Sequence, residues 1–272
     1  MKDFNKVLKH LSNKQWLLRD DWKEKINFLK SSLKKEKNMD TIRAIKNYTK
    51  IFKQPLTFKH DLTTIKTGRV YAKYTLLPNK PILNIYLKEL IIPRENYIFV
   101  SFDFKASQIK HLVVYKDLKN LKDLINSGKD IYEEFAKELN ITREEAKVCI
   151  LLLSYGGNEN TIKKEMPLLD SKQILEKYNK WFEIKNPTYI EKVKLNHIIQ
   201  KKEVEFFKMK LCKIYKNQDH RFQLHAFIHD EIILEVHKEH LYMIDIIKEY
   251  LEKYKKIKME VDVKTSETFQ FK

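Results

Sequence analysis

Two apolar segments, Leu224–Ile228 and Glu231–Val236, are separated by only two polar residues, His229 and Asp230. Runs of this length joined by a two-residue turn predict a β-hairpin. The tip of this hairpin carries two adjacent acids, Asp230 and Glu231. Because burial of an unpaired carboxylate is very costly, two alternatives follow: a solvent-exposed turn, or a site that binds a cation.

Helical and extended patterns alternate along the rest of the chain. Apolar residues three or four apart predict helices, and short runs rich in β-branched and aromatic residues predict strands. The predicted elements are helices over much of 1–52, a buried strand at Tyr97–Phe102, helices at 105–116, 130–155 (broken near Asn140), 170–186 and 188–216, the hairpin, a helix at 241–254 and a strand at 257–263. Helices and strands grouped in this way predict an α+β fold.

The chain is strongly basic, with a formal net charge of +17 over 272 residues. Residues 1–60 hold sixteen lysines and arginines against six acids, so much of the excess lies near the N-terminus. A surface of this charge attracts polyanions, nucleic acid first and anionic membrane second. The alternative interpretation is that frequent lysine reflects an AT-rich genome.

Other features of the composition exclude several classes of protein. Only two cysteines occur, Cys149 and Cys212, so no disulfide framework or cysteine zinc motif is predicted and a reducing compartment is expected. The N-terminus lacks the apolar core of a signal peptide, and no apolar run reaches the roughly 18 residues that span a bilayer. We therefore expect a cytoplasmic protein with no membrane partner.

A further acid, Asp103, follows the predicted buried strand and precedes a predicted helix. Taken alone, Asp103 is equally compatible with a helix N-cap. Together with Asp230 it provides two carboxylates at strand ends, which are suitable ligands for Mg²⁺. Two Mg²⁺ ions about 3.5–4 Å apart stabilise the attacking and leaving oxygens of a phosphoryl transfer. The sequence therefore predicts two Mg²⁺ ions at Asp103 and Asp230, for which Mn²⁺ can substitute.

The segment ITREEAKVCILLLSYGG places four side chains four residues apart: Arg143, Lys147, Leu151 and Tyr155. On a helix these residues form one slowly drifting stripe. Two cations, an apolar residue and an aromatic residue in line suit a nucleoside triphosphate, because the cations contact the phosphates and the flat surface contacts the base. The alternative is an ordinary amphipathic helix whose cations face solvent.

These features together resemble the palm and fingers of the family A (DNA polymerase I-like) DNA polymerases, from about residue 61 to the C-terminus. FVSFDFKASQIKHL, which contains Asp103, is similar to the motif that supplies the first metal-binding carboxylate. REEAKVCILLLSYGG is similar to the nucleotide-binding helix of the fingers, and FIHDEIILEVHKEH to the His-Asp-Glu motif of the palm hairpin. Each motif is modest alone, and their order and intervals make the resemblance specific.

The resemblance implies a role for each matching residue. The implied catalytic residues are Asp103, Asp230, Lys147 and Glu231, of which both aspartates bind metal. The implied dNTP-binding residues are Arg143, Lys147, Leu151, Tyr155 and Gln108. The implied contacts to primer–template DNA are Arg69 from TGRVYAKYTLLPNKPILN, His229 from the hairpin, and Lys192, Asn196 and Gln200, which keep the spacing of a family helix.

Three positions depart from the family pattern. Gln108 stands where the family has a Glu that packs against the sugar and excludes a 2′-hydroxyl, although Gln has nearly the same volume. Lys110 replaces an Arg, and Leu151 replaces an aromatic residue. The fingers are also short, and the C-terminal SETFQFK lacks the family's closing His. These departures leave the preference for deoxyribose over ribose open.

The resemblance implies a right-hand polymerase with an antiparallel-sheet palm, and it divides the chain into four parts. We expect a basic, thumb-like helical region at 1–60, the first part of the palm at 61–128, fingers at 129–190 and the second part of the palm at 191–272. The alternative for 1–60 is a helical cap on the palm. Neither length nor motif is present for a 3′–5′ exonuclease, so we expect an enzyme without proofreading. We also expect a monomer, of bacterial, phage or plasmid origin.

Three functions remain as alternatives. The first is a template-directed DNA polymerase that extends primers with dNTPs. The second is a primer- or RNA-synthesising polymerase of a phage or plasmid, which Gln108 and the similarity of GRVYA and SQIKHL to phage-type RNA polymerases favour. The third is a non-catalytic DNA-binding accessory protein, against which the retained Asp103, Asp230, Arg143 and Lys147 argue.

Overall fold

The computed structural model describes residues 2–35, 56–57, 59–61, 71–73, 88–184 and 189–271. The helices are α1 (Lys2–Asn13), α2 (Trp22–Lys35), α5 (Ser107–Tyr115), α6 (Lys119–Asn126), α7 (Ile131–Leu139), α8 (Arg143–Ser154), α9 (Glu159–Glu165), α10 (Ser171–Trp181), α11 (Tyr189–Asn217), the 3₁₀ helix η1 (Lys238–His240) and α12 (Met243–Glu252). The strands are β1 (Gln15–Leu18), β2 (Leu56–Thr57), β3 (Lys59–Asp61), β4 (Tyr71–Lys73), β5 (Ile91–Ile92), β6 (Tyr97–Phe104), β7 (Phe222–Ile228), β8 (Glu231–His237), β9 (Lys253–Tyr254), β10 (Ile257–Lys258) and β11 (Val261–Ser266).

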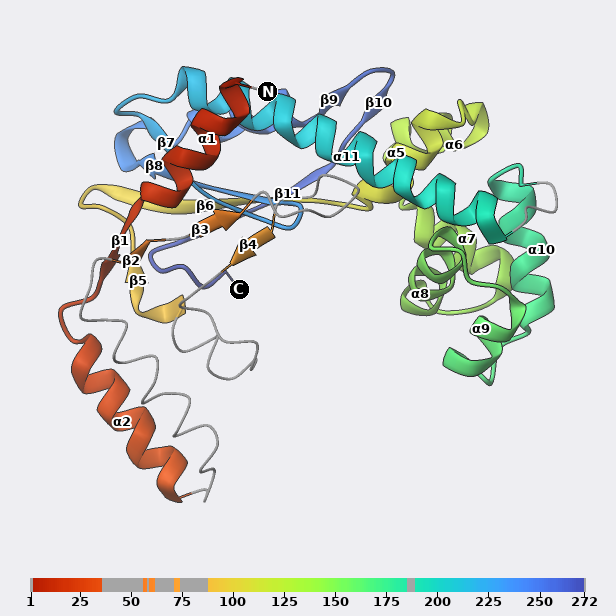
Figure 1. The fold of residues 1–272 in the computed structure, drawn as a ribbon, viewed down its shortest axis with the longest axis horizontal. Helices are drawn as coiled ribbons and strands as arrows, with labels where there is room; N and C mark the ends of the chain where they lie inside the picture. The colour runs from red at the N-terminus through yellow and green to blue at the C-terminus, as the bar shows by residue number, and fades with distance from the viewer. Residues whose placement is uncertain are drawn as a thin grey trace.

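These elements form a lobe built on a sheet and a lobe built of helices (Figure 1). Helices α7 to α10 gather in the helical lobe, and α11 runs from that lobe across the sheet lobe. Helix α2 projects away from both lobes. Within the ranges given above, no helix is both long enough and apolar enough to cross a bilayer.

A four-stranded antiparallel sheet, ordered β11-β6-β8-β7, is the centre of the sheet lobe. Successive residues of a strand point to opposite faces, so one face carries Val100, Phe102 and Phe104 and the other carries Phe99 and Asp103. The first face is buried in a large apolar core. The second face is covered at one end by a smaller core and leaves Asp103 exposed at the other.

The larger core is continuous through both lobes. It joins residues of α1, such as Leu11, to residues of α11, such as Leu211, and to Phe135 and Ile150 of the helical lobe, all fully buried. The smaller core packs Trp16 of β1 and Phe269 against Phe99 on the opposite face of the sheet. Burial of apolar surface on both faces fixes the sheet between two layers.

Local sequence signals explain where the helices of the second lobe begin and end. The Asp130 carboxylate accepts hydrogen bonds from the amides of Tyr132 and Glu133 and so caps α7, whose end has Asn140 in the left-handed conformation (φ 53°). Thr142 and Glu145 form a reciprocal capping box at the start of α8. The predicted break near Asn140 is therefore confirmed.

Helix α1 packs against the sheet lobe rather than standing apart from it. It contacts α11 and β7, and His10 Nε2 lies 3.1 Å from the carbonyl oxygen of Leu224. The expected division into thumb-like region, palm and fingers stays a prediction. The helix predicted from TIRAIKNYTKIF at 41–52 lies outside the described residues.

The structure corrects some predicted boundaries. The strand predicted at 257–263 is divided into β10 and β11, because Met259 between them is fully buried and its amide bonds to the Glu252 carbonyl. Strand β1 and helices α6 and α9 were not predicted, since segments of four to eight residues give little periodic signal. The α+β class with an antiparallel sheet is confirmed.

Candidate active site

Three carboxylates lie in a row across three adjacent strands of the sheet. Asp103 of β6 is paired with Asp262 of β11 on one side and with Glu231 of β8 on the other. Directly paired residues point to the same face, with Cβ atoms about 4.5–5.5 Å apart. The sheet therefore presents three acids together at the exposed end of this face.

A fourth carboxylate, Asp230, comes from the turn between β7 and β8. The turn is tight because His229 takes the left-handed conformation, with φ of 55°. His229 is exposed at the tip, whereas Asp230 is half-buried. The predicted hairpin thus brings Asp230 beside the row, near enough for its charge to act on Asp103.

The electrostatics of this cluster favour a bound cation. Burial, then the carboxylates of Asp230 and Asp262, raises the pKa of Asp103, while Lys264 and Lys147 oppose the shift. Burial and the nearby Glu203 raise the pKa of Asp230. Carboxylates that raise one another's pKa repel when ionised, and a divalent cation removes that repulsion. Oxygen ligands of this kind fit Mg²⁺.

Hydrogen bonds from two serines hold the supporting acids in place. Ser101 donates to the Glu231 carboxylate, and Ser107 donates to Glu203 at 2.8 Å. Burial raises the pKa of Glu231, and the bond from Ser101 opposes that shift. Glu203 is 5% exposed and comes from the middle of α11, so this helix contributes directly to the cluster.

The sequence interpretation missed Asp262, Glu203 and Lys264. The alternation in VDVKTS places Asp262 and Lys264 on one face of the last strand, which was an available signal. Glu203 lies seven residues after Asn196 and three after Gln200, on the same side of a helix. The pairing of β11 with β6, which connects residues far apart in sequence, was not readable from either pattern.

Helix α8 presents the stripe predicted from its sequence, with different environments for its members. Lys147 is exposed and lies near enough to Asp103 to affect its pKa. Arg143 donates from Nη2 and Nε to the single oxygen Oδ2 of Asp130, at 2.7 and 3.1 Å, and forms a further bond to Glu144. Leu151 is half-buried against the large core.

Tyr155 closes the other end of the stripe and contacts α5. Its hydroxyl donates a hydrogen bond to the side-chain carbonyl of Gln108. The amide therefore accepts the bond that a carboxylate would accept, and it does so without a charge. Tyr155 is 40% exposed, so its ring stays accessible to a ligand.

The predicted DNA-binding residues are only partly placed. Asn196 and Gln200 are half-buried on α11, on the same side as Glu203. Lys192 lies in the described backbone of the same helix. Arg69 lies outside the described residues. The structure thus brings Asp103, Asp230, Glu231 and Lys147 together, and it places Asn196 and Gln200 on the helix that supplies Glu203.

An antiparallel sheet with a carboxylate cluster at one end thus lies next to a helical lobe that presents lysine and tyrosine. A solved structure described as the POL domain of Pol1 from M. smegmatis, in complex with DNA primer-template and dNTP, has this fold. It superposes with a TM-score of 0.69 at 12% identity, over 86% of this chain and 52% of that chain.

A sequence comparison points the same way. The chain is 23% identical over 216 residues to DNA polymerase theta of Caenorhabditis elegans, which covers 64% of this chain and 14% of that protein. No family model matches the sequence. The chain therefore spans about half of the solved relative and about a seventh of the curated one. The predicted resemblance to family A polymerases is confirmed at the level of fold.

Proposed function

We propose that this chain is a template-directed DNA polymerase that adds dNTPs to a primer 3′-hydroxyl. The observation that carries the proposal is the row Asp262, Asp103 and Glu231, with Asp230 beside it and Lys147 facing it. The solved relative was determined in complex with primer-template and dNTP, which supports the same activity. We expect extension without 3′–5′ proofreading.

Asp103 and Asp230 are the proposed ligands of two Mg²⁺ ions, for which Mn²⁺ can substitute. Their raised pKa values and mutual repulsion fit a site that is completed by cations. Bound there, the two ions would supply a more acidic primer hydroxyl and charge stabilisation on the leaving pyrophosphate. Glu231 and Glu203 are proposed as supporting acids, each held in place by a hydrogen bond donated by a serine.

The helical lobe supplies the proposed contacts to the incoming nucleotide. Lys147, whose charge acts on Asp103, is the proposed partner of the triphosphate and the proposed acid that protonates the pyrophosphate as its bond to the α-phosphorus breaks. Arg143 must exchange its two hydrogen bonds with Asp130 for bonds to the phosphates. Leu151 and Tyr155 give the apolar and aromatic surface for the base and sugar.

The proposed DNA contacts extend from the carboxylates along α11 and the hairpin. Asn196 and Gln200 would contact primer–template DNA beside Glu203, together with Lys192, Arg69 and His229. A further basic surface lies at the N-terminus. It lines a hollow of about 460 Å³ between α1, α11 and β7, whose walls include Lys6, Lys9 and Lys14. Such a surface binds phosphates without sequence preference.

A second candidate function is synthesis with ribonucleotides, in primers or RNA. The observation that favours it is the bond from Tyr155 to the Gln108 side-chain carbonyl, because it leaves the NH₂ group of that amide as a donor that can pair with a ribose 2′-hydroxyl. The side chain keeps nearly the same volume, so steric exclusion opposes this function. The two effects are separated by measuring dNTP and rNTP use by the same protein.

The decisive experiment is primer extension on a defined template with Mg²⁺, offering dNTPs and rNTPs separately. Asp230→Asn is the test variant, because it keeps the shape of the side chain and removes its charge. Asp123→Asn, at an exposed position of α6, is the matched control. Extension with dNTPs that only Asp230→Asn abolishes would support the polymerase.

Other outcomes select the alternatives. Equal extension with rNTPs would favour the primer- or RNA-synthesising function. Intact DNA binding without extension of any kind would favour a non-catalytic accessory protein. A monomer is expected in either case, which sedimentation tests directly.

A further inference from the structure

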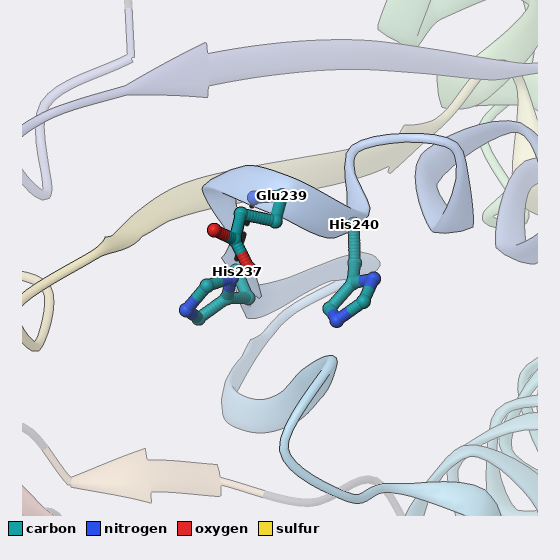
Figure 2. A group of neighbouring side chains, drawn as sticks. All are labelled: His237, Glu239 and His240. Carbon is teal, nitrogen blue, oxygen red and sulfur yellow. Dashed lines mark hydrogen bonds between the residues drawn. The ribbon is translucent and has the colours of Figure 1, made fainter.

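A second group of ligating side chains lies at the opposite end of β8 from the carboxylates. His237 ends β8, and Glu239 and His240 belong to η1, in the sequence HKEH. One ligand atom from each residue lies within 4.8 Å of the others. Figure 2 shows the three side chains projecting from the same corner of the chain, with the Glu239 carboxylate beside the His237 ring.

A third histidine and a tyrosine lie beside this group. The His220 ring, from the turn before β7, lies 5.4 Å from the His240 ring, and the Tyr97 ring packs edge-on to His237 at 5.0 Å. Among the described residues, the Glu239 carboxylate has no ion-pair partner, whereas the neighbouring Lys238 pairs with Glu267. The Glu239 amide donates to His237 Nδ1 at 3.2 Å, which holds the corner together.

The donor set selects a class of metal ion. Two imidazoles and one carboxylate match the ligands that Zn²⁺ takes, with bonds of about 2.0–2.2 Å. Mg²⁺ prefers oxygen ligands alone, so it fits the carboxylate row and not this corner. Ligand atoms on a tetrahedral zinc ion lie about 3.3 Å apart, which follows from those bond lengths. Rotation of the three side chains would bring their ligand atoms from within 4.8 Å to that spacing. The side chains have room to rotate, because Glu239 is exposed and both histidines are half-exposed.

We propose that His237, Glu239 and His240 bind one Zn²⁺ ion, with water as the remaining ligand. A zinc ion at Nδ1 of His237 would replace the Glu239 amide as the partner of that nitrogen. Glu231 begins β8 and His237 ends it, so the site lies about 20 Å from the carboxylate row. The site is therefore separate from the proposed polymerase centre.

The test uses the full chain, stripped of metal and kept in excess Mg²⁺ to saturate the carboxylate row. Co²⁺ is the spectroscopic probe, because it takes zinc sites and absorbs visible light in a distorted tetrahedral field. We expect one equivalent of Co²⁺ to give this absorption and Zn²⁺ to displace it. We also expect Zn²⁺ to raise the melting temperature of the protein, since it binds the native state.

Three variants make the test specific. In His240→Gln and Glu239→Gln, the Co²⁺ affinity is expected to fall more than about a hundredfold, beyond the 10–100-fold loss typical of an outer-shell change. His197→Gln, at an exposed histidine of α11, is the matched control and should bind as the unaltered protein does. Circular dichroism without metal checks that each variant is folded.

Two results would overturn the proposal. One is Co²⁺ absorption that survives in the double variant His237→Gln/His240→Gln, which would locate the ion elsewhere. The other is the absence of Co²⁺ absorption or of Zn²⁺ stabilisation in the unaltered, folded protein. Primer extension is not a readout in this experiment, so failure of the zinc site and failure of the polymerase function stay distinguishable.

Discussion

Substitution of Asp103 by Asn is expected to stabilise the metal-free protein. Asp103 lies between Asp262 and Glu231 in the carboxylate row, so the change removes one charge and with it two directly paired like-charge contacts. Each such pair costs about 0.2–1 kcal/mol, and solvent and the opposing Lys147 and Lys264 reduce the effect. A total of about 1 kcal/mol raises the melting temperature by about 2–4 °C in a protein of this size.

The gain should depend on pH in a defined direction. The folded-state pKa of Asp103 is raised above its ordinary value of 3.8. A carboxylate of this kind contributes stability that is fully present below the unfolded pKa and is lost as the pH rises through the folded pKa. The difference between the variant and the unaltered protein is therefore small near pH 4 and grows toward about pH 7.

Thermal unfolding followed by circular dichroism, in chelator and at low salt, measures this difference. Mg²⁺ is then added: it should stabilise the unaltered protein and have much less effect on Asp103→Asn. Asp123→Asn is the control for loss of an exposed acid outside the row. Two results would contradict this prediction. One is a melting temperature of Asp103→Asn no higher than that of Asp123→Asn at neutral pH, and the other is equal stabilisation of Asp103→Asn and the unaltered protein by Mg²⁺.

Three further predictions concern nucleotide binding and the buried charges of the sheet. Lys147→Ala should raise the KM for dNTPs at least about tenfold with little change in the DNA Kd, measured by steady-state extension and by anisotropy; equal losses would remove its assigned role. Gln108→Ala should increase the ratio of ribonucleotide to deoxyribonucleotide incorporation, because it removes both side-chain volume and the bond to Tyr155. Glu235→Gln should destabilise the protein by about 3 kcal/mol in urea unfolding, since Glu235 is 1% exposed and pairs with Arg94 at 2.9 Å. Its pKa is lowered, against burial, by His225, Lys14 and Arg94, so this loss should shrink as the pH falls below about 4.

Local patterns in the sequence were sufficient to predict the strand that carries Asp103 and the hairpin that carries Asp230. The apolar run before Asp103 and the polar pair between two apolar runs at Asp230 are signals within ten residues, and both elements form where they were predicted. The stripe on α8 is likewise a consequence of helical spacing alone. Roles for these residues came from the resemblance and stay predictions.

What the sequence could not provide is pairing between distant segments. Asp262 joins the row because β11 pairs with β6 across about 160 residues of chain. Arg143 binds Asp130, a residue used at the same time as the cap of α7, and no periodicity predicts that double use. The residues of the proposed zinc site are close in sequence, in HKEH, but their side chains meet only because η1 folds back beside the end of β8.

Helix α11 has a mechanical consequence. Its 29 residues form a rod of about 43 Å that packs beside α5 near its middle and against α1 and β7 toward its C-terminal end. Glu203, near the middle of this rod, is bonded to Ser107 at the start of α5. A shift of α5 would therefore act through this bond on Glu203, the acid whose charge acts on Asp230. The position of α5 and the electrostatics of the carboxylate cluster are thus coupled through a single side chain of α11.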